Sequence, residues 1–305
     1  MKVLKWALAA IVLMLAGVSS YVYTQLRDMQ VEQLSADLFV IRGIGGNVTV
    51  VRTSMGSVVI DSMTFPMQGR LIRQQVENLT GSDPVMVINT HYHLDHTHGN
   101  PGFAPGTRVI TTERTASHLQ YFDADFWESP DDLAPTETFS DSKKVQVGDK
   151  TLQLIHPGRA HTDGDLVVII EQESTIVMGD LLFNQHYPNI DLEAGGSVQQ
   201  WSETLDTVLQ YSFERVIPGH GATTDRVGIH EFQRFMGQLA KIGRAAAADG
   251  QSLEQVLAGN SLTSDKGFTE LQFAGIPIGL DRAFVLRRAW EESTGNFKQL
   301  NQPLN

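Results

Sequence analysis

The sequence predicts an α/β protein whose strands fall into two groups, with helices on the outer faces of the sheets. Short runs rich in β-branched residues alternate with stretches of helical spacing, first over residues 38–90 and again over residues 108–221. Hydrophobic residues make up 41% of the chain and charged residues 19%, as in an ordinary globular protein. Because sheets must bury their apolar faces, this repeated order favours sheets covered by helices.

The first series follows a polar stretch, residues 24–36, which we interpret as a linker. β-Branched runs bounded by glycine or polar residues predict its strands, and helical spacing predicts a helix over residues 66–78. The expected strands span residues 38–43, 48–52, 57–61 and 85–90.

The second series opens with a strand over residues 108–112 and a helix over residues 113–122. Four more strands are expected between residues 143 and 180. A helix over 197–210, a short strand over 215–221 and helices over 226–248 and 281–293 complete the chain.

The helix expected over residues 226–248 carries four apolar side chains on one face, which favours packing in the core or between two copies of the chain. They are Phe232, Phe235, Leu239 and Ile242. Three further aromatic residues, Phe268, Phe273 and Trp290, could cap a pocket from above.

Charge and cysteine content narrow the classes of function. The 305 residues carry a formal net charge of −12 with a pI near 5.2, which argues against broad nucleic-acid binding because that needs a basic surface. The chain has no cysteine, so any metal site must use His, Asp and Glu. The absence of thiols also suits an oxidising compartment.

The N-terminus has the pattern of an export signal. Lys2 and Lys5 precede an uncharged run from Trp6 to Leu26, and Val18-Ser19-Ser20 offers a small-residue cleavage site. The run is also long enough for an uncleaved membrane anchor. We therefore expect residues 1–28 to be a signal peptide or an anchor, and the protein to be periplasmic or held on the inner membrane facing the periplasm.

A cluster of metal-binding side chains follows the strand expected over residues 85–90. His91 and His93 are two residues apart, so on extended backbone both rings can reach one metal. Asp95 and His96 follow where the chain turns and could serve a second ion. The fourth histidine of this stretch is His98.

Four other residues of this type stand at or just after the ends of expected strands, where side chains from one sheet edge can converge. They are Asp61, His161, Asp180 and His220. Three neutral imidazoles leave an open position on zinc, as in catalytic sites, and a shared carboxylate would hold two ions about 3.5–4 Å apart.

These motifs resemble those of the metallo-β-lactamase-fold hydrolase superfamily. The signature H-x-H-x-D-H appears as HYHLDH, and AHTDGD, MGD and PGHG follow in the family's order. The resemblance implies a four-layer αββα sandwich of two mixed sheets with helices outside. Its core covers about residues 36–225 of a hydrolase domain at 29–305, whose C-terminal part, 226–305, is helical.

The resemblance also implies roles for individual residues. His91, His93 and His161 would bind one metal ion, Asp95, His96 and His220 a second, and Asp180 would bridge them. Asp61 would orient a ligand histidine, although it could instead cap a strand end. His98 could line the pocket or support a ligand, and His186 and Tyr187, in the loop after Asp180, could contact substrate.

We expect a dinuclear zinc hydrolase, with iron or manganese as other metals, that acts on a small molecule. A hydroxide bridging the ions would attack an ester, lactone, thioester or amide-type bond, and Asp95 would orient it and pass on a proton.

Alternatives are a β-lactamase, a mononuclear-iron persulfide dioxygenase and, less favoured, a nuclease or phosphodiesterase. The β-lactamase subclass with Cys at the position of Asp180 and Lys three residues later is disfavoured, because Phe183 stands at the later position.

Overall fold

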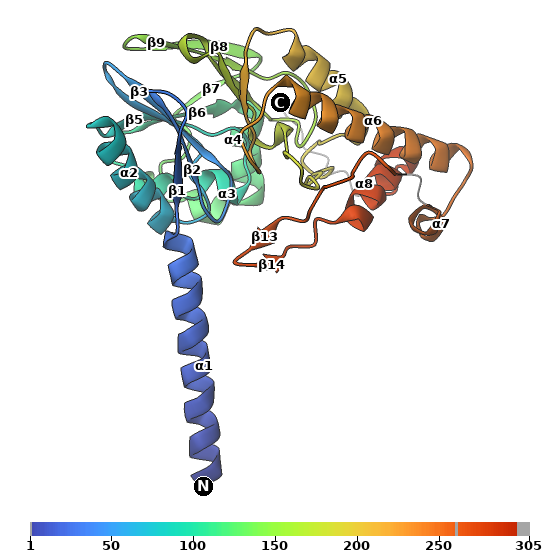
Figure 1. Cartoon of the computed structure of the whole chain (residues 1–305), viewed down its shortest axis with the longest axis horizontal. Helices are drawn as coiled ribbons and strands as arrows, with labels where there is room; N and C mark the ends of the chain where they lie inside the picture. Colours follow the sequence, from blue (N-terminus) through green and yellow to red (C-terminus); the bar gives the residue numbers. More distant parts are fainter. Residues whose placement is uncertain (1, 260–261, 298–305) are drawn as a thin grey trace.

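Two β-sheets pack face to face in the computed structural model, which describes residues 2–259 and 262–297. Helices cover the outer face of each sheet, so the layers run helix, sheet, sheet, helix (Figure 1). This is the expected αββα sandwich, and the prediction of the fold is confirmed.

The first sheet has seven strands in chain order. Its first four strands pair antiparallel and its last four pair parallel, so it is mixed as expected. The strands are β1 (Gln30–Gln33), β2 (Leu38–Arg42), β3 (Val48–Thr53), β4 (Gly56–Ile60), β5 (Pro84–Ile88), β6 (Arg108–Thr112) and β7 (Glu137–Phe139).

The second sheet has five strands in the order β12-β11-β10-β9-β8, and only β11 and β12 pair parallel. A separate two-stranded hairpin lies near the C-terminus. These strands are β8 (Ser142–Val147), β9 (Lys150–Ile155), β10 (Val167–Ile170), β11 (Thr175–Val177), β12 (Arg215–Ile217), β13 (Gln272–Phe273) and β14 (Ile276–Pro277).

Alternating side chains hold the layers together. In β2, Leu38 and Val40 point into the core between the sheets, whereas Phe39 and Ile41 belong to the core on the outer face. All four are buried because both faces of the strand are covered. Strands that are apolar on both faces therefore favour a layered fold over a sheet with one solvent-exposed face.

Helices from opposite ends of the chain cover the two sheets. Residues of α2 (Pro66–Thr80) pack on the first sheet, and those of α5 (Val198–Leu209), α6 (Arg226–Ala248) and α8 (Arg282–Thr294) pack on the second. Phe232, Phe235 and Leu239 of α6 lie in this second outer core. The remaining helices are α3 (Leu94–Thr97), α4 (Glu113–Phe122) and α7 (Leu253–Ala258), and five short 3₁₀ turns lie between elements.

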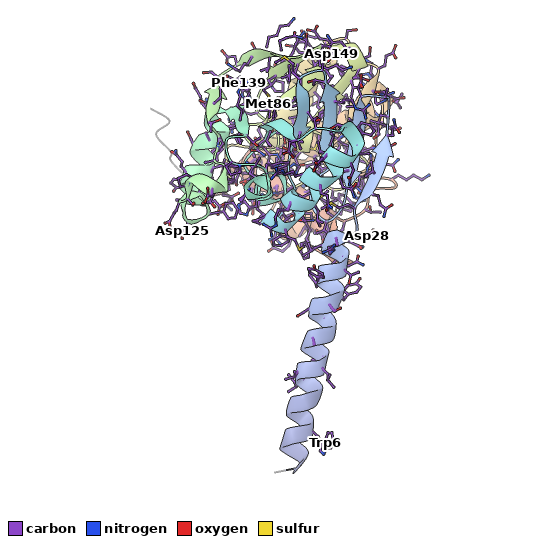
Figure 2. All side chains as sticks on the ribbon, turned by 90° about the vertical axis from the view of Figure 1, so that its left-hand side faces the viewer. Trp6, Asp28, Met86, Asp125, Phe139 and Asp149 are labelled. Carbon is purple, nitrogen blue, oxygen red and sulfur yellow. The ribbon has the colours of Figure 1, made fainter. Side chains whose placement is uncertain are left out.

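The N-terminal helix α1 (Lys2–Arg27) projects from the body, with Trp6 near its far end and Asp28 where it meets the sheets (Figures 1 and 2). The stretch interpreted as a linker is instead the end of this helix followed by β1, so that interpretation was wrong. No helix within the described residues is both long and apolar enough to cross a bilayer.

Candidate metal centre

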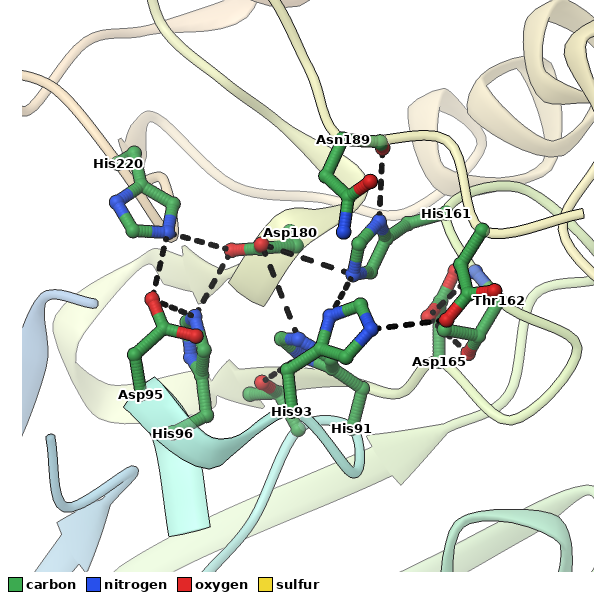
Figure 3. Close-up of polar contacts among 12 residues, drawn as sticks. His91, His93, Asp95, His96, His161, Thr162, Asp165, Asp180, Asn189 and His220 are labelled. Atoms are coloured by element: carbon green, nitrogen blue, oxygen red, sulfur yellow. Dashed lines mark hydrogen bonds and ion pairs between the residues drawn. The ribbon is translucent and has the colours of Figure 1, made fainter. Parts of the chain in front are cut away.

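The site lies where strands of both sheets end. The first sheet contributes the turn after β5, which carries His91 and His93, and the second sheet contributes the turns after β11 and β12, which carry Asp180 and His220. β4 runs parallel to β5 and β11 parallel to β12, so their carboxyl ends face one edge of the sandwich. Figure 3 shows these side chains pointing toward one another.

Four donor residues form a first group that could hold a metal ion: His91, His93, His161 and Asp180. Nε2 of His161 lies 2.8 Å from Nδ1 of His93. Oδ2 of Asp180 lies 3.6 Å from Nε2 of His161 and 3.8 Å from Nε2 of His91. Three imidazoles and a carboxylate therefore converge on one point.

A second group comprises Asp95, His96 and His220. Nε2 of His220 is 3.3 Å from Oδ2 of Asp95, and Nε2 of His96 is 3.6 Å from the same oxygen. The other carboxylate oxygen of Asp180, Oδ1, lies 3.1 Å from His96 and 3.4 Å from His220. One carboxylate thus turns one oxygen toward each group.

Orphaned polar atoms show that these residues fit a bound metal. Nε2 of His91, Nε2 of His96 and Oδ1 of Asp180 are buried and make no well-formed hydrogen bond within the described part of the chain, although His96 and Asp180 are close. Buried polar atoms without partners are costly. Nitrogen and oxygen donors in this arrangement suit Zn²⁺, and the residues present therefore fit the ion.

Burial lowers the pKa values of the histidines and the neighbouring carboxylates raise them, so the net shift differs from one histidine to another. Burial lowers the pKa of His161 to about 4, and the neighbouring His93 adds to this. Burial also lowers the pKa of His220, but the carboxylate of Asp180 more than offsets it and the pKa rises to about 9. The pKa of His96 is raised in the same way. The second group therefore holds protons at neutral pH that a metal would have to displace.

Asp61 fixes the ring of His96 from behind. Its Oδ2 is 2.8 Å from Nδ1 of His96, and its two oxygens accept hydrogen bonds of 2.8 Å from N and Oγ1 of Thr90. An Nδ1–H donated to Asp61 leaves Nε2 of His96 free to face the centre. Asp61 is buried and adopts a positive φ of 64°.

Asp191 holds His93 in a similar way, and the sequence did not single it out. Its Oδ2 lies 2.9 Å from Nε2 of His93 and also accepts a hydrogen bond from the Tyr92 hydroxyl. This leaves Nδ1 of His93 toward His161. The sequence does show that Asp191 is an acidic residue in the loop after Asp180. No motif or spacing, however, links Asp191 to His93.

The glycines of the β2–β3 loop are needed for close approach. A Cβ on Gly46 would lie 2.2 Å from Cε1 and 2.6 Å from Nε2 of His96. The Gly46 amide donates to the carbonyl of Asp95 at 3.1 Å. The loop therefore lies directly against the second donor group.

A cavity of about 760 Å³ opens over the two groups, a volume typical of small-molecule sites. His93, Asp95, Asp180 and His220 line its floor. Its walls come from the β2–β3 loop, from the segment after Asp180 and from residues 269–280.

The other candidate residues are placed differently. His186 lines the cavity, and its Nδ1 is 3.0 Å from Oγ1 of Thr269. The Tyr187 hydroxyl donates to Asp265 at 2.8 Å, and Tyr187 is not among the residues that line the cavity. His98 also lies outside it, where it pairs with Asp123 and stacks on Phe126.

Of the three aromatic residues considered as caps, Phe273 lines the cavity. Phe268 and Trp290 pack against the outer core of the second sheet instead.

Sequence comparison places this site in a family. The model of the metallo-beta-lactamase superfamily matches residues 41–220, which include all seven donors. The chain therefore belongs to the metallo-β-lactamase superfamily and is a metallo-hydrolase of that superfamily.

Proteins that are similar to this chain in sequence carry the names of different enzymes. The chain is 25% identical over 208 residues to a type 2 metallo-β-lactamase of Bacillus sp. strain 170, covering 65% of this chain and 78% of that one. It is 26% identical over 168 residues to the alpha subunit of a 2,4-dinitroanisole O-demethylase of Nocardioides, covering 54% and 49%.

A solved structure shares the fold. The metallo-β-lactamase from Pontibacter korlensis aligns with a TM-score of 0.61 at 19% identity, covering 69% of this chain and 99% of that one. Proteins similar in sequence to this chain thus carry different names, and the solved structure shows that the fold is shared.

Proposed function

We propose that this metallo-hydrolase binds two zinc ions and hydrolyses an ester, lactone, thioester or amide-type bond. The observation that carries the proposal is the position of Asp180, whose two oxygens face two separate donor groups. Two ions there would lower the pKa of bound water toward ~7 and polarise the oxygen of the substrate carbonyl. Iron or manganese also accepts such donors.

The two donor groups support an assignment of the residues to two ions. His91, His93 and His161 would hold the first, and Asp95, His96 and His220 would hold the second, with Asp180 shared. Asp61 and Asp191 would fix the ring orientations through the hydrogen bonds described above. These contacts would keep the donors in place before substrate arrives.

Asp95 is the proposed catalytic residue because its carboxylate both faces His220 and lines the cavity. One of its oxygens would orient the attacking water and pass a proton to the leaving group. Water would add to the acyl carbon, the bond to the leaving group would break, and that group would depart protonated. His186, whose Nδ1 faces Thr269, would offer Nε2 to the substrate.

The test is an initial-rate panel on the zinc-loaded protein with a β-lactam, a lactone, an aryl ester, a thioester and a phosphodiester. Asp95→Asn serves as the blank. We expect one acyl class well above the blank. Full activity in Asp95→Asn would refute its proton role, and turnover of the phosphodiester alone would refute acyl hydrolysis.

Metal analysis distinguishes the proposed zinc hydrolase from the alternative, a mononuclear-iron dioxygenase. One bound iron, with oxygen uptake on persulfides and no hydrolysis, would replace the present proposal by a dioxygenase. The second donor group favours two ions.

For location we propose export to the periplasm, which Lys2, Lys5 and the uncharged run behind them support. Cell fractionation with a C-terminal tag tests this, and recovery of the protein in the cytoplasmic fraction would contradict it.

A further inference from the structure

One wall of the cavity comes from a part of the chain beyond the matched family region. Residues 269–280, here called the C-terminal arm, contribute seven of the residues that line the cavity, whereas the match to the family model ends at residue 220. They are Thr269, Glu270, Leu271, Gln272, Phe273, Ile278 and Leu280, with the hairpin β13–β14 between them.

The base of the arm is fixed to the loop that follows Asp180. The Thr269 amide donates to the carbonyl of Gln185 at 3.0 Å, and the Tyr187 amide donates to the carbonyl of Thr269 at 3.1 Å. Buried Asp265 accepts from the Tyr187 hydroxyl at 2.8 Å and from the Arg282 guanidinium at 2.6 Å. The arm is therefore positioned relative to the metal centre.

The far end of the arm reaches the other half of the molecule. Ala274 and Gly275 both have positive φ, 49° and 82°, as a tight two-residue hairpin turn requires. The ring of Phe273 meets that of Phe65, beside the start of α2, at 6.4 Å between centroids. Figure 1 shows the hairpin extending from the side of α8 toward α1.

The arm presents an apolar surface to the cavity through Leu271, Phe273, Ile278 and Leu280, and Ile44 of the β2–β3 loop also lines the cavity. Apolar side chains around a cavity favour an apolar ligand group, since its transfer from water removes apolar surface.

Apart from the metal centre, the side chains that the structure describes along the cavity offer no free cation to an anionic substrate. Among the described residues that line it there is no lysine, and Arg42 is the one arginine. Its guanidinium is held by Glu32 at 2.5 Å and by the Thr223 hydroxyl at 2.8 Å. Glu270 adds a negative charge to the lining. A substrate carboxylate, such as that of a penicillin, would find no unengaged side-chain cation.

We propose that the C-terminal arm binds an uncharged, apolar acyl chain, so that the substrate is a neutral ester or lactone carrying such a chain. This inference rests on the proposed hydrolase function and names its substrate class. The arm acts as the specificity element, and the donor residues of the cavity floor would supply the chemistry.

Two isoleucines of the arm provide a matched pair of variants. Ile278 lines the cavity and is 52% exposed, whereas Ile276 is 68% exposed and outside the lining. Ile278→Asp places a charge in the proposed chain site, and Ile276→Asp places the same charge two residues away. Neither side chain is buried, so both variants should fold.

The first measurement is kcat/KM of the zinc-loaded protein for 4-nitrophenyl acetate, butyrate and octanoate, beside benzylpenicillin. We expect kcat/KM to rise with chain length by up to about fourfold for each methylene that becomes buried. Ile278→Asp should lower the octanoate value at least about tenfold and leave acetate within twofold, and Ile276→Asp should leave both unchanged. The inference would be overturned if kcat/KM did not change with chain length, if Ile278→Asp and Ile276→Asp had the same effect on it, or if kcat/KM were highest for benzylpenicillin.

The second measurement needs no hydrolysis. We expect 1-octanol to bind the zinc-loaded protein in calorimetry and to bind Ile278→Asp at least about tenfold more weakly. Octanol binding without turnover of any ester, lactone, thioester or β-lactam of the panel would defeat the proposed function but keep the arm as a chain site. Ester turnover without octanol binding would defeat the inference and keep the function.

Discussion

Replacing Gly46 with alanine tests the reasoning about the second donor group. The new Cβ would lie 2.2 Å from Cε1 of His96, while carbon atoms in contact are about 3.5–4.0 Å apart. The ring, the loop or both must therefore move by about 1.3 Å or more. The ring is held by Asp61 at 2.8 Å, so a shift of that size would break the bond or misdirect Nε2.

We expect Gly46→Ala to lose metal from the second group while the first keeps its ion. Disturbing the support of a ligand histidine typically lowers metal affinity about 10–100-fold, or ~1.4–2.7 kcal/mol. Metal content after dialysis against a weak chelator should fall from two zinc ions to one. Over-packing should also cost about 1–3 kcal/mol of stability, seen as a lower Tm.

Gly237→Ala is the matched control, because a Cβ there would meet its nearest neighbour, Oγ of Ser202, only at 3.8 Å. It lies within α6, where alanine is preferred to glycine by about 1 kcal/mol. If Gly46→Ala retained two tightly bound ions, the close approach of the loop would not matter to the metal centre, and our reading of it would be wrong.

Two further predictions concern the same group. Asp61→Asn, which tolerates the positive φ at that position, should weaken binding of the second zinc about 10–100-fold in competition titrations; unchanged affinity would exclude an orienting role. Because the pKa of His220 is raised to about 9, with that of His96 also raised, both should be protonated at pH 7 without metal and must lose a proton to bind it. Zinc binding should then release protons at pH 7, and affinity should rise with pH until about 9, measurable by calorimetry in buffers of different ionisation enthalpy. Binding without proton release at pH 7 would contradict the assignment.

Local patterns determined most of the architecture. Residues 113–122 and 226–248 form helices with the expected bounds because their apolar spacing and end signals are contained within the segment. β1, β7 and the hairpin β13–β14 were missed because they are two to four residues long and partly exposed. Such strands depend on partners distant in sequence rather than on a pattern of their own.

The seven donors could be named from the sequence because each stands in a short motif at a strand end, and the fold brings such ends together. What the sequence could not provide is which side chains stand behind and above them. Asp191 meets His93 across 98 residues, and the arm meets the loop after Asp180 across more than 80. Tyr187 and His98 turned away from the cavity for the same reason, since Asp265 and Asp123 are their partners. The donor residues lie in short motifs that can be recognised in the sequence. The shape of the cavity instead depends on contacts between segments distant in sequence, and only the tertiary structure determines those contacts.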